Sequence, residues 1–546
     1  MSGSGGKRYS ILGVAGLVLL LVLATALRVI GLGDESFWFD EGYTVAFVSM
    51  PFTKMLAYMP THEPHPPLYF IIVNIWSCLG VSELLLRLPS AIFGVLTVLV
   101  LWRCVREQWG IAPAFAAAAL CATSGICIWY SQEARMYSLV LLLAAISMRY
   151  FLRFVSPLDL SRKRDAAWLT AANAALLYTH NLAVLVPVAQ WIVMCPWAAA
   201  QWHIPDRWAR VKRWTAAQAI LAGVAVPWIY LLILQRGYVQ SGFWIPRPTL
   251  GLVVDHLRYL LVFESQEITA LMLTPLAVLC VLTCVSMRRD ARVWATVTCG
   301  VVPVIACYCY SRVYTPIMIP RVILYVTIPI FILMGLSIYC GGFDSSPAVY
   351  RRGRQLLGTV CVAGLIVCNL LGWYRERTRV SKDEFRRAAR IASTMIDKGT
   401  AIVFPNAGSQ PPFDYYFDKY PFHERVAEIP LPMHYRDIPP GKRNLELPVT
   451  RESASPVHEV RRDGSFELPV TRESIAWLAE RLGGKKRTLV VMNHARGTDP
   501  RGMVKSYFDT QWVLEEKIDL VEITLLIYTH CLPPSPLPPP PDGVHP

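Results

Sequence analysis

Charged residues are scarce in this chain. Asp, Glu, Lys and Arg make up 17% of its 546 residues, against about 25% in an ordinary soluble domain. Hydrophobic residues make up 54%, and the mean hydropathy is +0.38. A soluble protein could not bury so much apolar surface, and the same composition excludes disordered, collagen-like and coiled-coil chains. The sequence therefore predicts a polytopic α-helical membrane protein.

Cysteine is almost absent from the C-terminal part. Of the 14 Cys residues, 13 precede residue 374, mostly within apolar runs, where a buried Cys behaves as a small hydrophobic residue. Only Cys531 follows, so the C-terminal part has no internal disulfide framework. Neither a CxxC pair nor a Cys/His spacing typical of structural zinc occurs in the sequence.

Acidic residues are few in the first two thirds of the chain. Residues 1–373 contain 28 Lys and Arg but 16 Asp and Glu, whereas residues 374–546 contain 25 and 23. The net charge of +14 therefore belongs mainly to the apolar part, where basic residues report orientation in a membrane. We expect no nucleic-acid partner on this account.

The apolar residues form runs long enough to cross a bilayer, which requires about 20 residues in a helix. The first run follows Lys7-Arg8 and ends near Ala24-Thr25-Ala26, as in a secretory signal peptide, but the many later runs favour a retained helix. His180-Asn181 divides an uncharged stretch of 40 residues into two spans. About eleven spans are predicted, at residues 11–31, 87–102, 111–130, 136–153, 166–180, 182–198, 215–234, 268–287, 293–310, 322–340 and 356–373.

Basic residues are unevenly divided between alternate loops. One set of loops contains 17 Lys and Arg and the opposite set seven, so the positive-inside rule places the N-terminus in the cytoplasm and the C-terminal part outside the cell (inner) membrane. Residues 67–79 are apolar but too short for a span. They are predicted to form a membrane-dipping helix within one long external loop, residues 32–86.

The chain changes character after residue 373. The proportion of charged residues rises, and helical patterns alternate with strand patterns. We expect a transmembrane domain over residues 1–373 and a small extracytoplasmic α/β domain over 374–530. Its predicted helices are 383–397 and 471–482, and its predicted strands are 400–405, 487–493 and 521–528. The octapeptide ELPVTRES occurs at 446–453 and again at 467–474, and residues 531–546 form a Pro-rich tail that we expect to be disordered.

Three polar groups lie in predicted external loops close to the membrane. Each has a structural explanation. Asp40-Glu41 fits a solvated carboxylate pair, the prolines after His65 fit the start of a helix, and Glu133 fits a cap on the next helix. Capping does not explain Arg135 and the tyrosines near Glu133. Charged groups beside a bilayer are costly unless they are solvated or have a function. The three groups are Trp38–Tyr43, His62–Tyr69 and Tyr130–Ser138.

These motifs resemble those of a known family, the GT-C membrane glycosyltransferases. The most similar branch contains the protein O-mannosyltransferases and the lipid A aminoarabinose transferase. The resemblance runs from the first span to about residue 425, with the strong motifs between residues 38 and 137. The segments that carry it are Trp38–Tyr43, His65–Tyr69, Arg87–Ser90, Ser131–Tyr137, Phe243–Pro248 and Ile319–Arg321.

The resemblance implies an activity. Such enzymes move a sugar from a polyprenyl-phosphate carrier in the membrane to an acceptor protein, lipid or polysaccharide outside the cytoplasm, usually with inversion. Asp40 occupies the family's catalytic acidic position. The aminoarabinose branch has Glu-Lys-Pro where this chain has His65-Pro66-Pro67, so metal binding by that Glu is not carried over. A divalent metal ion held by Asp40, His65 and Glu133 and a metal-free site both stay open.

The chemistry of the reaction suggests roles for the remaining residues. Inverting transfer needs a base for the acceptor hydroxyl, for which Asp40 is the candidate, with Glu41 and Glu133 as the other catalytic carboxylates. A lipid-phosphate leaving group needs cationic stabilisation more than a proton, and an Arg side chain can hold phosphate through two hydrogen bonds. His180 is expected to be a polar residue at a helix end. The expected substrate- and phosphate-binding residues are His65, Tyr69, Arg135, Tyr137, Arg247 and Arg321.

Two other functions fit a polytopic chain. A transporter of a lipid-linked or small polar substrate usually has charges inside its spans and often inverted repeats, whereas the ionisable residues here cluster in loops and the spans show no repeat. A non-catalytic scaffold that presents the α/β domain leaves the three polar groups unexplained. We therefore favour a glycosyltransferase.

The charge count makes a prediction about orientation. A reporter enzyme that is active only outside the cytoplasm, fused to the C-terminus, should be active, because an odd number of spans separates the two ends of the membrane part. A reporter that is active only in the cytoplasm should be inactive at the same position. The opposite pattern would contradict the predicted topology.

Overall fold

A computed structural model of the protein describes residues 11–156, 163–200, 207–239, 245–263, 266–338, 348–397, 399–420, 426–431, 470, 472–494, 499 and 501–530. The first ELPVTRES copy, half of the second copy, Phe243-Trp244 and the Pro-rich tail lie outside these residues. The chain divides into two compact units. The first contains residues 1–33, 52–236 and 245–379, and the second contains residues 34–51, 237–244 and 380–546.

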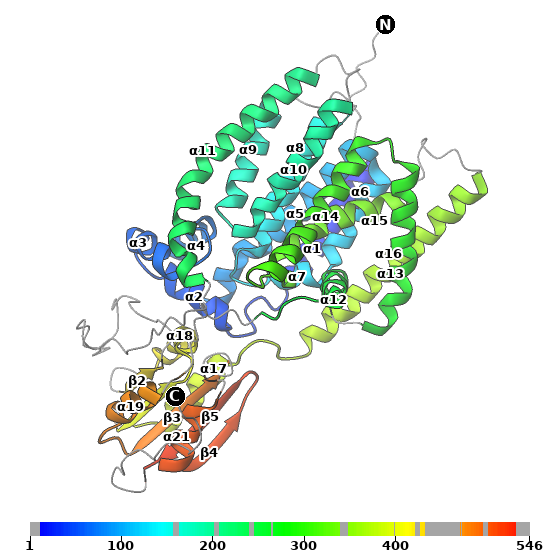
Figure 1. Ribbon diagram of the computed structural model, residues 1–546. Helices are drawn as coiled ribbons and strands as arrows, with labels where there is room; N and C mark the ends of the chain where they lie inside the picture. The colour runs from blue at the N-terminus through cyan, green and yellow to red at the C-terminus, as the bar shows by residue number, and fades with distance from the viewer. Residues whose placement is uncertain are drawn as a thin grey trace. The chain divides into compact units, whose positions relative to one another are not determined.

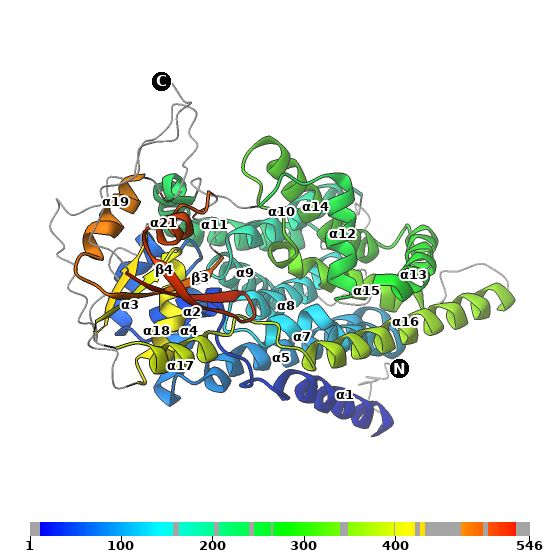
Figure 2. The ribbon, with the colours of Figure 1, turned by 90° about the horizontal axis from the view of Figure 1, so that it is seen from below.

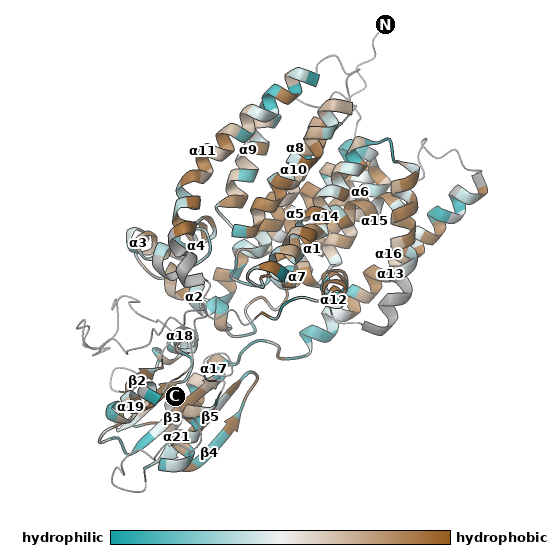
Figure 3. Ribbon diagram, viewed as in Figure 1, coloured by the Kyte–Doolittle hydropathy of each residue, from teal (hydrophilic) through white to brown (hydrophobic). Residues whose placement is uncertain are grey.

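The first unit is built from helices (Figure 1). Apolar residues dominate along most of them, and the basic N-terminal ends of α11 and α16 are more hydrophilic (Figure 3). The helices and 3₁₀ turns (η) are α1 (Ile11–Val29), α3 (Phe52–His62), α4 (Leu68–Trp76), η1 (Ser77–Leu79), α5 (Glu83–Trp109), α6 (Ile111–Thr123), α7 (Gly125–Ser131), α8 (Tyr137–Val155), α9 (Lys163–Leu177), η2 (Asn181–Val184), α10 (Leu185–Ala200), α11 (Arg207–Val239), α12 (Leu250–Leu261), α13 (Gln266–Ser286), α14 (Ala291–Val313), η3 (Pro320–Val326), α15 (Thr327–Ser337) and α16 (Ala348–Arg377).

The predicted polytopic class is confirmed. Within the described residues, eight helices are long and apolar enough to cross a membrane, and the bent pair α6 and α7 makes a ninth if it counts as one span. Helices α9 and α13 coincide with the other two predicted segments, so the count of eleven stays a prediction. Helix α4 has only nine residues, which fits the expectation that this segment does not span.

Polar side chains join α8, α9 and α10 inside the first unit. The Ser147 hydroxyl donates to Asn173 Oδ1 at 2.6 Å, the Asn173 amide donates to Gln190 Oε1 at 2.9 Å, and the Gln190 amide donates to Ser147 Oγ at 2.7 Å. All three side chains are buried. A closed ring of hydrogen bonds satisfies polar groups that lipid could not satisfy, and it therefore holds α9 within the bundle.

A break between α6 and α7 frees backbone carbonyls inside the membrane part. The two helices meet at Ser124 with a bend of 58°. The carbonyl oxygens of Cys121 and Ala122, at the end of α6, accept hydrogen bonds from Arg28 at 3.1 and 3.0 Å. Arg28 is fully buried in the last turn of α1 and also donates to Ser131 Oγ at 3.2 Å. A cation thus caps the negative end of the broken helix.

The C-terminal end of α1 is capped by a residue that follows α7. The Gln132 side chain, which follows α7, donates to the carbonyl oxygens of Arg28 at 3.2 Å and Ile30 at 3.1 Å. Gly94 of α5 makes room for this arrangement, because a Cβ atom there would lie 2.1 Å from Ser131 Oγ and 2.6 Å from Arg28 Nε. The end of α1 and the break between α6 and α7 are therefore fixed to each other.

The second unit contains a five-stranded sheet in the order β2-β1-β3-β5-β4. Strand β1 is parallel to β2 and β3, and β5 is antiparallel to β3 and β4. All five residues of β1 are buried, as expected for a central strand covered on both faces. The elements are α2 (Phe39–Val48), α17 (Phe385–Met395), β1 (Thr400–Phe404), η4 (Ala407–Ser409), α18 (Gln410–Phe417), β2 (Ala427–Pro430), α19 (Arg472–Arg481), β3 (Arg487–Asn493), α21 (Met503–Gln511), β4 (Val513–Asp519) and β5 (Ile523–Thr529).

Helices cover both faces of this sheet. Figure 2 shows α19 and α21 on one face and α17 and α18 on the other. The first face is packed by a core that includes Leu478, Phe508 and Val403. The predicted C-terminal α/β domain is thus present. The sequence indicated α17, α19, β1, β3 and β5, but not β2 or the edge strand β4, which is mostly exposed.

The second unit also contains part of the predicted first external loop. Residues 34–51, including helix α2, group with the α/β fold rather than with the helical unit. Helix α2 packs against α18. Nothing in the periodicity of either segment signals this pairing, because their contact depends on residues more than 340 positions apart in the chain.

Gly94 provides a test of the buried cation. Gly94→Ala should lower the stability of the membrane part by about 1–3 kcal/mol, because the new methyl group must displace Ser131 or Arg28 in a packed interior. Gly223→Ala in α11 is the matched control, since its Cβ would meet nothing within 4 Å. Thermal unfolding in detergent measures both variants. Equal stability of the two variants would contradict the role given to Gly94.

Candidate active site

Four segments of the first unit bring polar side chains together. They are the turn between α3 and α4, the segment from the end of α7 to the start of α8, the turn between α9 and η2, and the start of η3. Contacts and electrostatic interactions connect their side chains, as described below. We call this group the polar cluster, and its members are Glu63, His65, Tyr130, Glu133, Arg135, Tyr137, His180 and Arg321.

Glu63 and His65 form a close pair in this cluster. His65 Nδ1 lies 2.5 Å from Glu63 Oε1, and the His65 backbone N–H donates to the same oxygen at 3.1 Å. Burial by itself would raise the pKa of Glu63, but His65 and then Arg135 outweigh it and hold the pKa below its ordinary value. Glu63 is therefore an anion that fixes the orientation of the His65 ring.

His180 lies at the centre of the polar cluster. Its ring centroid is 5.8 Å from that of His65 and 6.1 Å from that of Tyr137. Burial, followed by the neighbouring His65, Arg135 and Arg321, lowers the pKa of His180 to about 3. The ring is thus neutral near pH 7, and Leu182 N–H donates to Nδ1 at 3.2 Å. Nε2 therefore bears the proton and is a neutral hydrogen-bond donor.

Sequence reasoning treated His180 as a polar residue at a helix end. The neighbouring backbone explains its placement in the cluster. Asn181 donates to the Pro64 carbonyl at 2.8 Å, and Leu68 N–H donates to the Tyr178 carbonyl at 2.8 Å. These bonds tie the turn after α9 to the turn before α4. The only signal in the sequence is the pair His180-Asn181 within a long uncharged stretch.

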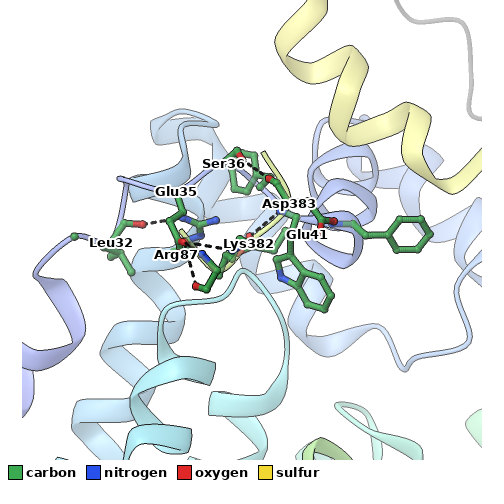
Figure 4. Close-up of polar contacts among 12 residues, drawn as sticks. Leu32, Glu35, Ser36, Glu41, Arg87, Lys382 and Asp383 are labelled. Atoms are coloured by element: carbon green, nitrogen blue, oxygen red, sulfur yellow. Dashed lines mark hydrogen bonds and ion pairs between the residues drawn. The ribbon is translucent and has the colours of Figure 1, made fainter. Parts of the chain in front are cut away.

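Ser90 connects two of the sequence motifs. Tyr69 and Ser90 share a hydrogen bond of 3.0 Å between their hydroxyl groups, and Ser90 Oγ donates to the Arg135 carbonyl at 3.3 Å. One turn earlier in α5, the buried Arg87 donates to the Leu32 carbonyl at 3.0 Å (Figure 4). The motif Arg87–Ser90 therefore positions the backbone around the cluster.

The other predicted arginines differ in placement. Arg135 is buried, and Arg321 is half-buried at the start of η3, where its charge acts on Tyr130 together with that of Glu133. The rings of Tyr130 and Tyr137 are tilted by 59° to each other, with 4.8 Å between their centroids. Arg247 is exposed on the segment before α12, and no contact described for this part of the chain joins it to the polar cluster.

Asp40 and Glu41 lie in the second unit, in the first turn of α2. Glu41 is fully buried; its Oε2 atom lies 3.8 Å from Lys382 Nζ and accepts a hydrogen bond from Trp38 N–H at 3.4 Å (Figure 4). Asp40 is half-buried. The structure therefore gives Glu41 a structural partner, while Asp40 is the more accessible of the two carboxylates.

Asp383 holds the N-terminus of α2. Its Oδ2 atom accepts a hydrogen bond from Phe39 N–H at 3.0 Å and lies 3.6 Å from His494 Nε2. The nearby Asp383 carboxylate raises the pKa of His494 against the opposing effect of burial, and the charges of Glu522 and Asp40 add to the rise. A carboxylate and a protonatable ring thus lie beside the first turn that carries Asp40.

The metal site of Asp40, His65 and Glu133 stays a prediction. Across the part of the chain that the structure describes, no three His, Cys, Asp or Glu side chains are grouped so that they could hold a metal ion. The set of Asp40, His65 and Glu133 accordingly enters no step of the mechanism below.

The fold and this cluster can now be compared with known proteins. Residues 64–231 match the family model of dolichyl-phosphate-mannose-protein mannosyltransferases. The whole chain resembles ArnT from Cupriavidus metallidurans in the apo state, with a TM-score of 0.57, 12% identity and coverage of 94% of this chain and 98% of that chain. The chain has the GT-C fold. The resemblance predicted from the sequence motifs is confirmed.

Other solved GT-C structures agree. ArnT from the same organism bound to undecaprenyl phosphate gives a TM-score of 0.58 at 12% identity over 95% of this chain and 98% of that chain. The apo oligosaccharyltransferase of Archaeoglobus fulgidus gives 0.52 at 11% identity over 89% of this chain and 70% of that chain. No curated protein sequence matches the chain significantly. These structural likenesses extend over most of this chain and show its fold.

Proposed function

We propose that this GT-C protein is an inverting glycosyltransferase that moves a sugar from a polyprenyl-phosphate carrier to an acceptor outside the cytoplasm. The observation that carries the proposal is the grouping of the His180 ring with the rings of His65 and Tyr137, at 5.8 and 6.1 Å between centroids. The charges of Arg135 and Arg321, which lie on separate segments, also act on the His180 ring. Two arginines around a buried hydrogen-bond donor suit a phosphate group. The acceptor is a protein, a lipid or a polysaccharide.

The polar cluster supplies what departure of the lipid phosphate needs. The leaving group is already a good anion, so fixed positive charge stabilises the transition state more than proton donation does. Arg135 and Arg321 provide the charge. His180 Nε2–H adds a neutral donor at the same place, while Tyr69 acts indirectly through Ser90 on the Arg135 backbone. His65 and Tyr137 line the cluster and suit contacts to the sugar.

Asp40 is the proposed general base. It lies at the second position of α2, where the helix macrodipole stabilises a carboxylate. Glu41 is fully buried beside Lys382, whereas Asp40 is half-buried, so Asp40 is the more exposed carboxylate of this pair. In the proposed step, the acceptor oxygen attacks the anomeric carbon, Asp40 takes its proton, and the bond to the lipid phosphate breaks. Glu133 orients the sugar or Arg135.

The arginines provide the first test of the phosphate site. Arg135→Lys and Arg321→Lys should each weaken binding of undecaprenyl phosphate roughly tenfold, because a point charge replaces a planar fork. Arg247→Lys is the matched control and should bind normally. Binding is measured on purified protein in nanodiscs, with thermal unfolding as a check on folding. Wild-type affinity in both Arg135→Lys and Arg321→Lys would contradict the proposed site.

Asp40→Asn tests the base. Asn keeps the shape but cannot accept the proton, so release of polyprenyl phosphate from an extracted lipid-linked sugar should fall by roughly 10²–10⁴-fold. Binding of undecaprenyl phosphate should stay normal. Glu41→Gln should lower the stability of the folded protein, whereas it should change the turnover per bound donor molecule less. Near-normal turnover in Asp40→Asn would exclude this residue as the base.

A further inference from the structure

The strand order of the second unit creates a position that open α/β sheets commonly use for ligands. After β1 the chain continues to β2 on one side, and β3 later pairs with the other side of β1, parallel to it. Ligands of such sheets bind beyond the carboxyl ends of the strands, where the strand order reverses. Here the segment that follows β1 is joined to the last residue of β3 by a hydrogen bond of 3.1 Å from Ser409 Oγ to Asn493 Oδ1.

Helix α2 occupies this position. The Phe39 ring packs edge-on against the His494 ring, just after β3, with 5.4 Å between centroids. The same Phe39 ring lies against Gly408, just after β1, where a Cβ atom would come within 2.4 Å of Phe39 Cζ and 2.6 Å of the Tyr43 hydroxyl. Phe39 therefore contacts the segments after both strands, and the missing side chain at Gly408 makes room for it.

Contacts on the other side of α2 are equally close. A Cβ atom at Gly42 would lie 2.5 Å from Pro412 Cδ at the start of α18. The segment before the helix is held by two hydrogen bonds, from Phe37 N–H to the Tyr416 hydroxyl at 2.7 Å and from the Ser36 hydroxyl to the Asp383 carbonyl at 2.5 Å. With the Asp383 carboxylate on Phe39 N–H, these contacts define the position of the first turn.

This docking matters because α2 is short. A helix of ten residues is marginal in water by itself, since isolated helices need about 12–15 residues to be stable. The geometry of its first turn, which carries Asp40, therefore depends on the surface that holds it.

We infer that the α/β fold uses the switch point of its sheet to hold helix α2 and thereby positions Asp40 for catalysis. Gly408, Asp383 and Tyr416 are positioning residues on this docking surface. The catalytic part of the inference rests on the proposed role of Asp40, whereas the docking itself does not.

Hydrogen–deuterium exchange of the full chain in nanodiscs tests the docking. Gly408→Ala should raise exchange of the amides in residues 39–48 by at least roughly tenfold, because the methyl group displaces the Phe39 ring. Exchange in β5 should match the wild type, which checks that the sheet is intact. Gly399→Ala is the matched control at the opposite end of β1, where the nearest atom to its Cβ is Asp397 Oδ1 at 3.5 Å.

Catalytic consequences are measured in the same variants. Misplacement of a reacting group by about 1 Å can cost 10²-fold in rate, so Gly408→Ala should lower turnover with the extracted lipid-linked sugar roughly 10- to 100-fold while binding of undecaprenyl phosphate stays normal. Tyr416→Phe removes one hydrogen bond and should show the same pattern at smaller size, and Gly399→Ala should behave as the wild type.

The outcomes distinguish the docking of α2 on the sheet from the catalytic role of Asp40. Unchanged exchange of α2 in Gly408→Ala and Tyr416→Phe would overturn the docking surface. Faster exchange with normal turnover would overturn the positioning role, provided that Asp40→Asn is inactive. If Asp40→Asn is also active, the proposed base is wrong, and the exchange data alone decide whether the sheet holds α2.

Discussion

Every backbone polar group that leaves a regular helix inside the membrane part must find a new partner, because lipid offers none. The break between α6 and α7 poses this problem directly. The Arg28 guanidinium satisfies the freed carbonyls, and Gln132 satisfies those at the end of α1. Glu133 and Arg135 follow shortly after Gln132 in the chain. The hydrogen bonds of Gln132 therefore also fix the position of this part of the polar cluster. A buried cation without this set of acceptors would cost several kcal/mol, so Arg28 and the carbonyl groups that it binds depend on each other.

Much of the helical part was predictable because its signal is local. Apolar runs identify helices at all eleven expected segments, and the short apolar segment after Pro67 does become the short helix α4. The break at Ser124 was not predicted, since Ser124-Gly125 lies within a continuous apolar run and Arg28, which binds the freed carbonyls, is nearly 100 residues away. Strand β4 was also missed, because an exposed edge strand lacks the buried alternation that marks its neighbours.

The candidate site was predictable in its parts but not in its grouping. The motifs identified His65, Glu133, Arg135 and Tyr137, and the fold brings them together with Arg321. Arg247, with equal standing in the sequence, lies exposed and apart from them. Glu63 and His180 were missed because their significance arises from packing between turns: a carboxylate two residues from a histidine is common, and only the surroundings of His180 explain why its ring is neutral. Adjacent Asp40 and Glu41 likewise proved unequal, since one is paired with Lys382 and the other is not buried to the same degree.

The composition of the second unit has a consequence for how the protein is made. Phe39 and Asp383 are separated by 344 positions, and at about 5–20 residues per second a ribosome needs roughly 20–70 s to cover that distance. Throughout this interval α2 exists without the surface that holds it. Strand β5, which follows the other strands of the sheet in the chain, then completes the sheet on which the earlier helix α2 packs. Docking of α2 is thereby delayed until this sheet has been translated, and a chain that terminates before it would insert in the membrane with α2 unsupported.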